Sequence, residues 1–108
     1  EDWRMDPKTL TARWSAGESV RLLDVREPEE LVVASLPGAR HIPLGTLMDR
    51  MDELEDWREE AFVVMCHHGV RSAHAVGYLR SVGFAGAENL DGGIDRWSID
   101  VDPEIRRY

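Results

Sequence analysis

Residues 61–72 read AFVVMCHHGVRS, and this stretch decides the fold. Its first half, Ala61 to Cys66, is a continuous apolar run of strand length, which is typical of a central strand covered on both faces. A short loop with one glycine follows, and a helical pattern then runs from Ser72 to Val82. A buried strand that leads through a tight loop into a helix is the repeating unit of an α/β fold. The inward side chains of this helix are expected to be Ala73, Val76 and Leu79.

The rest of the chain alternates short apolar runs with amphipathic stretches, without repeats or low-complexity tracts. Further strands are predicted at Val20–Val25, His41–Ile42 and Glu88–Leu90. Helices are predicted after Asp6-Pro7, after Glu27-Pro28, from Leu44 to Leu54 and after Gly92-Gly93. This alternation predicts a three-layer α/β fold, with a small, mostly parallel sheet and helices on both faces.

Several large side chains recur at helical spacing and are interpreted as core. Aromatic and thioether groups in such a pattern usually pack rather than bind a cofactor. The helix from Leu44 to Leu54 has the clearest period, with charged residues on its opposite face. The predicted core positions on the helices are Leu10, Trp14, Leu44, Leu47, Met48, Met51, Leu54, Ile94 and Trp97.

The length of 108 residues and the 43% of hydrophobic residues predict one domain, residues 1–108, with a core of about 5–98 and a polar tail over 99–108. No apolar run approaches the roughly 20 residues of a membrane-spanning helix, and no N-terminal stretch is typical of a signal peptide. The net charge of −8 makes nucleic acid and anionic membranes poor partners, because binding them relies on clustered Lys and Arg.

Cys66 is the only cysteine, so it cannot form an internal disulfide or act alone as a dithiol pair. A lone cysteine fits a reducing compartment, and a cytoplasmic location is expected. At the end of an apolar strand, such a residue is most often an inert part of the core. The residues that follow it favour a functional role, either as a nucleophile or as a sulfur carrier.

The loop from Cys66 to Arg71 has the features of an anion-binding nest. A tight turn between a strand and a helix directs successive backbone N–H groups inward, and the positive end of the helix dipole points to the same place. A thiolate there is stabilised relative to the thiol. Gly69 is expected to adopt a positive φ, Arg71 to add a fixed positive charge, and Ser72 to cap the helix and hydrogen-bond to the sulfur or to a loop group.

Two kinds of covalent catalysis fit a nucleophilic sulfur in such a nest. One moves a sulfane sulfur through Cys–S–SH, and the other moves a phosphoryl group through Cys–PO3. The loop contains six residues from Cys66 to Arg71. A phosphoryl group has three equatorial oxygens and needs a wider ring of donors, so the short loop favours sulfur transfer.

The chain resembles the rhodanese-like (thiosulfate sulfurtransferase) family from about Met5 to Tyr108, and its active-site loop is similar to that of single-domain bacterial members. Four matching segments occur in the family's order: LLDVRE (22–27), LPGARHIP (36–43), CHHGVRS (66–72) and LDGGIDRW (90–97). The family's phosphatase relatives have a loop one residue longer. Members often have Gly-His before the second segment, whereas this chain has Ala34-Ser35, a departure that concerns helper contacts and not the nucleophile.

The resemblance implies a function and a set of site residues. Cys66 would attack the outer sulfur of thiosulfate or another sulfane-sulfur donor, and a thiol or protein acceptor would then take that sulfur, without any cofactor. The persulfide would be held by the loop residues His67, His68, Gly69, Val70, Arg71 and Ser72. Asp24 and Arg26 are interpreted as a structural pair, through a buried ion pair or backbone bonds, and Arg40 as either a helper for an anionic donor or a surface residue.

Three alternatives stay open at this stage. The chain could be a sulfur-relay or partner-binding module with little turnover on thiosulfate, or a phosphatase or arsenate reductase. His67 and His68, with His74 nearby, invite a zinc interpretation. Consecutive residues in a tight loop do not usually converge on one ion, so no metal is expected.

Overall fold

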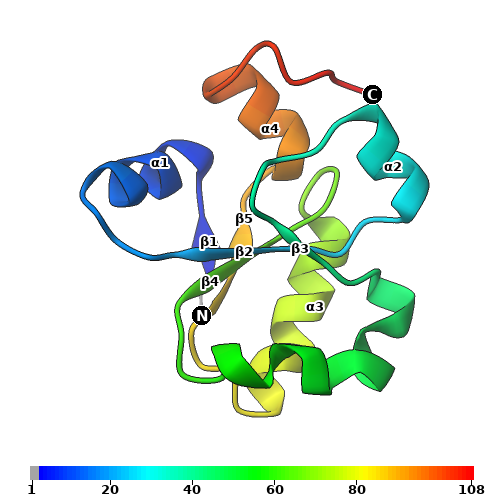
Figure 1. Ribbon diagram of the computed structural model, residues 1–108. Helices are drawn as coiled ribbons and strands as arrows, with labels where there is room; N and C mark the ends of the chain where they lie inside the picture. Colours follow the sequence, from blue (N-terminus) through cyan, green and yellow to red (C-terminus); the bar gives the residue numbers. More distant parts are fainter. Residues whose placement is uncertain (1–2) are drawn as a thin grey trace.

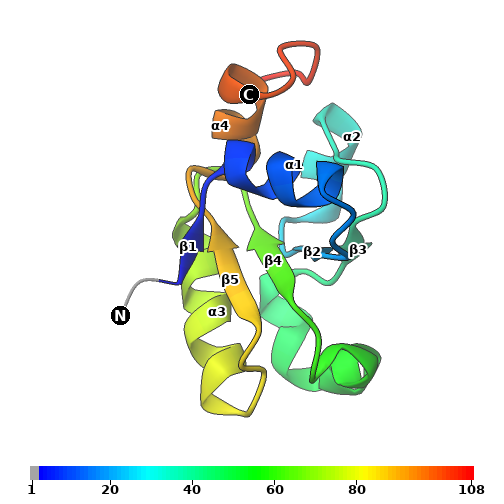
Figure 2. The ribbon, with the colours of Figure 1, turned by 90° about the vertical axis from the view of Figure 1, so that its left-hand side faces the viewer.

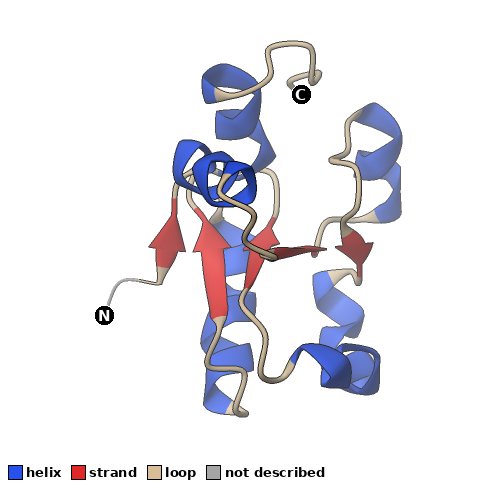
Figure 3. Ribbon diagram, turned by 60° about the vertical axis from the view of Figure 1, so that its left-hand side comes forward, coloured by secondary structure: helices blue, strands red, loops and turns tan. Residues whose placement is uncertain are grey.

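The computed structural model describes residues 3–108 and is organised around a five-stranded, all-parallel sheet with the order β1-β5-β4-β2-β3. The sheet lies between α1, α2 and α4 on one side and α3 and the 3-10 helix η1 on the other (Figure 1). Figure 2 shows β1, β5 and β4 side by side, and Figure 3 shows the strands between the two groups of helices. This architecture is the predicted three-layer α/β fold.

The elements follow one another in strand–helix alternation. The strands are β1 (Arg4–Met5), β2 (Arg21–Asp24), β3 (Arg40–His41), β4 (Phe62–Met65) and β5 (Ala87–Leu90). The helices are α1 (Pro7–Ser15), α2 (Pro28–Val33), η1 (Leu44–Trp57), α3 (Val70–Ser81) and α4 (Gly93–Asp100). The predicted start of α1 is confirmed, because the Asp6 side chain accepts the Thr9 N–H at 2.7 Å and Pro7 opens the helix.

Alternating side chains of the central strands divide the core into two clusters. Val63 and Met65 of β4 pack with Leu10 of α1 and with Ile94 and Trp97 of α4. On the opposite face, the remaining β4 side chains meet α3 and η1. All four β4 residues are buried, which confirms a central strand covered on both faces. Members of this second cluster include Phe62, Val64, Cys66, Leu47, Leu54, Val76 and Leu79.

Two predicted core positions are wrong. Met48 is 70% exposed, because the segment forms 3-10 turns with a kink at Arg50 instead of one α-helix, so the predicted apolar stripe is broken. Ala73 is exposed and Ala75 is buried instead. The helix starts at Val70 instead of Ser72, and Ala75, Val76 and Leu79 form its inward face.

The edge strand β1 was not predicted, because a strand of two residues with one polar side chain leaves no periodic pattern. It pairs with β5 through the Arg4–Asn89 and Met5–Leu90 register. Helix α4 extends to Asp100, so the first two residues of the predicted tail are helical. Within residues 3–108, no helix is both long and apolar enough to cross a membrane.

Candidate active site

Cys66 lies directly after β4, at the carboxyl edge of the sheet, where parallel α/β folds place their ligand sites. Its side chain is buried, with 1% of the residue exposed. Three groups surround the sulfur. The backbone N–H groups of Gly69 and Ser72 donate to Sγ at 3.1 and 3.4 Å, and the Ser72 hydroxyl lies 3.3 Å away. The predicted inward-facing amides are therefore confirmed at these two positions.

The sulfur acts as the acceptor for the first turn of α3. Gly69 is the N-cap residue with φ 97°, as predicted, and has no side chain that could cap the helix. The first-turn N–H groups of a helix lack intrahelical partners, and one of them, from Ser72, points at the sulfur. The prediction that Ser72 caps the helix is wrong, since it lies inside the first turn, while Val70 opens the helix and is 67% exposed.

Asn89 of β5 fixes this loop and was missed by the sequence analysis. Its side-chain oxygen accepts the Ser72 hydroxyl at 2.5 Å, and its side-chain nitrogen donates to the Gly69 carbonyl at 2.9 Å. The residue is buried, and its amide occupies the space between β5 and the loop. The strand sequence AENL contains two polar residues, so nothing in its pattern singles out Asn89. Asn89 therefore holds both residues whose amides contact the sulfur.

The N-terminus of α4 is attached to the same loop. The backbone N–H groups of Ile94 and Asp95 donate to the carbonyls of Cys66 and His67 at 3.0 and 3.1 Å. A Cβ atom at Gly93, where φ is 62°, would lie 2.4 Å from the His67 oxygen and 2.5 Å from the Cys66 oxygen. The prediction that Gly92-Gly93 lets the last helix lie close to the loop is confirmed.

Among the described residues, the side chain of Arg71 hydrogen-bonds to a carboxylate and not to the sulfur. Its two terminal nitrogens donate to both oxygens of Glu30 in α2, at 2.6 and 2.8 Å. The Tyr108 hydroxyl donates to Glu30 and accepts from Arg26, and its ring stacks on His67 with centroids 3.8 Å apart. The expected inward charge of Arg71 is thus paired with a carboxylate beside the loop.

The Arg71–Glu30 pair makes stability depend on pH. Hydrogen bonds from Arg71 lower the pKa of Glu30 from 4.5 to about 2. A carboxyl group whose folded pKa is depressed stabilises the protein above its unfolded pKa, and this contribution is lost as the pH falls from about 4.5 towards 2. We expect Glu30→Gln to lower the free energy of unfolding by about 1–2 kcal/mol at pH 7, after discounting for partial exposure.

Urea unfolding of the wild-type protein and of Glu30→Gln at pH 7 and pH 3 measures this effect. The difference between the two proteins should shrink at pH 3. Glu29→Gln is the matched control, because Glu29 is an exposed neighbour in α2, and it should change stability little at either pH. A difference for Glu30→Gln that stays constant between the two pH values would contradict the assignment.

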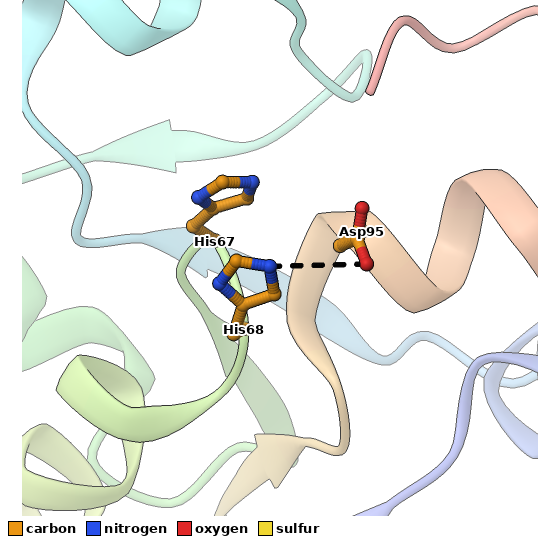
Figure 4. Close-up of side chains that lie close together, drawn as sticks. All are labelled: His67, His68 and Asp95. Carbon is orange, nitrogen blue, oxygen red and sulfur yellow. Dashed lines mark ion pairs between the residues drawn. The ribbon is translucent and has the colours of Figure 1, made fainter. Parts of the chain in front are cut away.

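His67 and His68, the two residues of the loop that follow Cys66, stack on one another. Their ring centroids are 3.8 Å apart, and the Nε2 atom of His68 lies 3.8 Å from a carboxylate oxygen of Asp95 in α4 (Figure 4). Burial, followed by the neighbouring His68, lowers the pKa of His67. His67 Nε2 is buried without a hydrogen-bond partner among the described residues.

Asp24 and Arg26 form the predicted buried ion pair. The Nη2 atom of Arg26 lies 2.7 Å from Asp24 Oδ2, and both side chains are at most 1% exposed. Arg26 also donates to the Ala34 carbonyl at 2.9 Å, which ties α2 to the sheet. Arg40 takes the surface alternative, because it pairs with Asp56 at 2.9 Å and lies over the Trp57 ring.

These features define a class of protein: a parallel α/β domain that holds one cysteine in an amide-lined loop after its central strand. Residues 6–100 match the rhodanese-like domain, and the chain belongs to that family. The sequence resemblance is thus confirmed over most of the chain. The matched family, and relatives that are named as sulfurtransferases, place the chain in a sulfurtransferase family.

Two relatives and one solved structure illustrate the likeness. The putative sulfurtransferase YtwF of Bacillus subtilis is 33% identical over 95 residues, which cover 88% of this chain and 89% of that protein. Adenylyltransferase and sulfurtransferase MOCS3-2 of Zea mays is 39% identical over 97 residues, 85% of this chain but 20% of the maize protein. A rhodanese-related protein from Thermoplasma volcanium superposes with a TM-score of 0.82 and 31% identity, covering 97% and 98% of the two chains.

This chain spans between 20% and 31% of the length of four larger relatives that it matches. For YtwF, by contrast, the aligned region is nearly the whole protein. The shared unit therefore occurs both alone and within larger proteins.

Proposed function

We propose that the chain transfers sulfane sulfur from thiosulfate or a persulfide donor to a thiophilic acceptor, through a persulfide on Cys66. One observation carries the proposal: the only thiol of the protein accepts backbone N–H groups from Gly69 and Ser72 at the N-terminus of α3. Such donors stabilise negative charge on sulfur, both on the thiolate that attacks and on the persulfide that results.

The reaction has two balanced steps. In the first, the Cys66 thiolate attacks the outer sulfur of thiosulfate, a new S–S bond forms, the S–S bond of thiosulfate breaks, and sulfite leaves with its electron pair. In the second, an acceptor such as cyanide or a thiolate attacks the outer sulfur of the persulfide and regenerates the Cys66 thiolate. Each step conserves charge and needs no oxidant.

The loop favours sulfur over a phosphoryl group. The donors around Sγ are two amides and one hydroxyl, and Arg71, which would be needed to hold the phosphoryl oxygens, is bonded to Glu30 on both terminal nitrogens. One added sulfur atom needs fewer donors than three phosphoryl oxygens. This supports the short-loop argument against a phosphatase or an arsenate reductase.

A relay role is the second candidate, and the burial of the thiol favours it. With Cys66 only 1% exposed, a free small donor reaches the sulfur only when the surrounding side chains move. A docked partner could move them. Larger relatives named adenylyltransferase and sulfurtransferase contain this unit as a minor part of their length, which also supports delivery of sulfur within an assembly. We also propose that the protein works in the cytoplasm, because a single cysteine that forms no internal disulfide fits a reducing compartment.

Parallel assays of the wild-type protein test the proposal. We expect thiocyanate from thiosulfate and cyanide, and no hydrolysis of an aryl phosphate. A protein that forms little thiocyanate but passes labelled sulfur from a low-molecular-weight persulfide to a thiol would be a relay. Aryl phosphate hydrolysis without any sulfur transfer would overturn both forms of the proposal.

Asn89 is expected to position the loop for this reaction. In Asn89→Ala the Ser72 hydroxyl and the Gly69 carbonyl lose their shared partner, so the amides around Sγ are held less firmly. We expect the rate of sulfur transfer to fall by about tenfold or more, since small misplacements of reacting groups reduce rates strongly.

Steady-state kinetics and urea unfolding should be measured together for this variant. Ser98→Ala is the matched control: Ser98 is also buried, but its hydroxyl hydrogen-bonds to the Ile94 carbonyl within α4 and not to Ser72 or Gly69. It should lose stability without a comparable loss of rate. Equal rates for Asn89→Ala and the wild type would remove Asn89 from the site.

A further inference from the structure

We propose that His67 and His68 of the sulfur loop, together with Asp95 of α4, form a binding site for a divalent transition metal ion such as Zn²⁺. One ligand atom from each residue lies within 4.8 Å of the other two. Figure 4 shows the His67 ring stacked above the His68 ring, with Nε2 of His68 facing the Asp95 carboxylate. Two imidazole nitrogens and one carboxylate oxygen are a ligand set that zinc accepts, with a fourth position left for water or an anion.

The three residues are held together by the backbone. Asp95 lies in the first turn of α4, and its N–H donates to the carbonyl of His67 at 3.1 Å. The Ile94 N–H makes the equivalent bond to Cys66 at 3.0 Å. These bonds fix the helix against the loop before any ion binds, so little conformational entropy remains to be lost on binding. Adjacent histidines alone did not predict a metal, and Asp95 supplies the third ligand from another element.

An unpartnered atom also points to a ligand. His67 Nε2 is buried and has no hydrogen-bond partner among the described residues. A buried polar atom without a partner is destabilising, and a metal ion would satisfy its lone pair.

Arg107 competes for the same carboxylate. Its guanidinium lies 2.9 and 3.2 Å from the two Asp95 oxygens, and its side chain is 60% exposed. An exposed arginine can leave this contact at little energetic loss. The two imidazole rings are inclined by 30°, so one must rotate for both nitrogens to face a single ion. Without a metal ion, the Arg107 guanidinium therefore pairs with the Asp95 carboxylate, and a bound ion would replace this contact.

Calorimetric titration of ZnCl₂ into Cys66→Ser protein tests the proposal, because this background removes the thiol as a zinc ligand. We expect one ion per chain. His68→Ala and Asp95→Asn should each weaken binding by at least about tenfold, since each removes a ligand. Arg107→Gln should strengthen binding severalfold by removing the competing cation.

His74→Ala is the matched control, because His74 is an exposed histidine of α3 outside the cluster, and it should bind zinc like the parent. Circular dichroism establishes that each variant is folded. No binding by the folded parent, or equal affinity after loss of His68 or Asp95, would overturn the proposal. Weaker binding in Arg107→Gln would also contradict it. These outcomes do not depend on whether the protein transfers sulfur.

Discussion

Replacing Cys66 by serine is expected to reduce sulfur transfer by about 10³-fold or more, because it removes the nucleophile and the atom that carries the persulfide. The hydroxyl that replaces the thiol keeps nearly the same shape and can accept the same N–H groups from Gly69 and Ser72. A loss of this size without a comparable loss of stability would therefore report on chemistry and not on folding.

Thiocyanate formation and urea unfolding measure the two quantities in this variant. A double variant, Cys66→Ser with Ser81→Cys, controls for the presence of a thiol, since Ser81 is exposed at the end of α3. It should regain reactivity towards thiol reagents but not sulfur transfer. Transfer by either variant at a rate near that of the wild type would contradict the role of Cys66.

The largest loss of stability is expected from Arg26→Met. Arg26 is fully buried and donates to Asp24, to the Ala34 carbonyl and to Tyr108. Burial alone would lower the pKa of Arg26, but the hydrogen bonds and charge interactions with Asp24 and Tyr108 together outweigh it, and the pKa is raised. Its removal leaves the Asp24 carboxylate buried without a counter-charge, which is destabilising by about 3–5 kcal/mol.

Equilibrium unfolding in urea measures this loss. Arg96→Met is the matched control, because Arg96 also pairs with aspartates, Asp91 and Asp100, but is 40% exposed. That variant should lose less than about 1 kcal/mol. The double variant Asp24→Leu/Arg26→Met should recover part of the loss, since it removes both buried charges. If Arg26→Met and Arg96→Met lost the same free energy of unfolding, burial of the Asp24–Arg26 pair would not explain its contribution to stability.

Much of the fold could be predicted from the sequence, because its signals are local. The apolar run before Cys66 indicated a central strand, Asp6-Pro7 marked a helix start, and Gly69 marked a turn with positive φ. Each depends on a few neighbouring residues and on backbone conformations that those residue types favour. The structure agrees with all three.

The predictions that fail depend on contacts between distant elements, on a broken period, or, for Ala73 and Ser72, on a helix start two residues earlier than predicted. Met48 follows a regular spacing, yet the kink at Arg50 turns it into solvent. The pairing of Arg71 with Glu30 joins residues from two helices, and no spacing indicates it.

Three residues of the site were not predicted because their contacts also join distant parts of the chain. Asn89 reaches the loop from β5, Asp95 reaches His68 from α4, and Tyr108 reaches His67 from the end of the chain. These contacts could not be predicted, because a sequence pattern relates only residues that are close together along the chain.

The claim that an added sulfur atom resides on Cys66 is tested most directly by mass spectrometry of the intact protein after incubation with thiosulfate. We predict a gain of about 32 Da, the mass of one sulfur atom, located on Cys66 and removed by cyanide. Incubation with a persulfide donor should produce the same gain if the protein is a relay. An unchanged mass with every sulfane donor, from a protein whose thiol is shown to be reduced, would contradict the account.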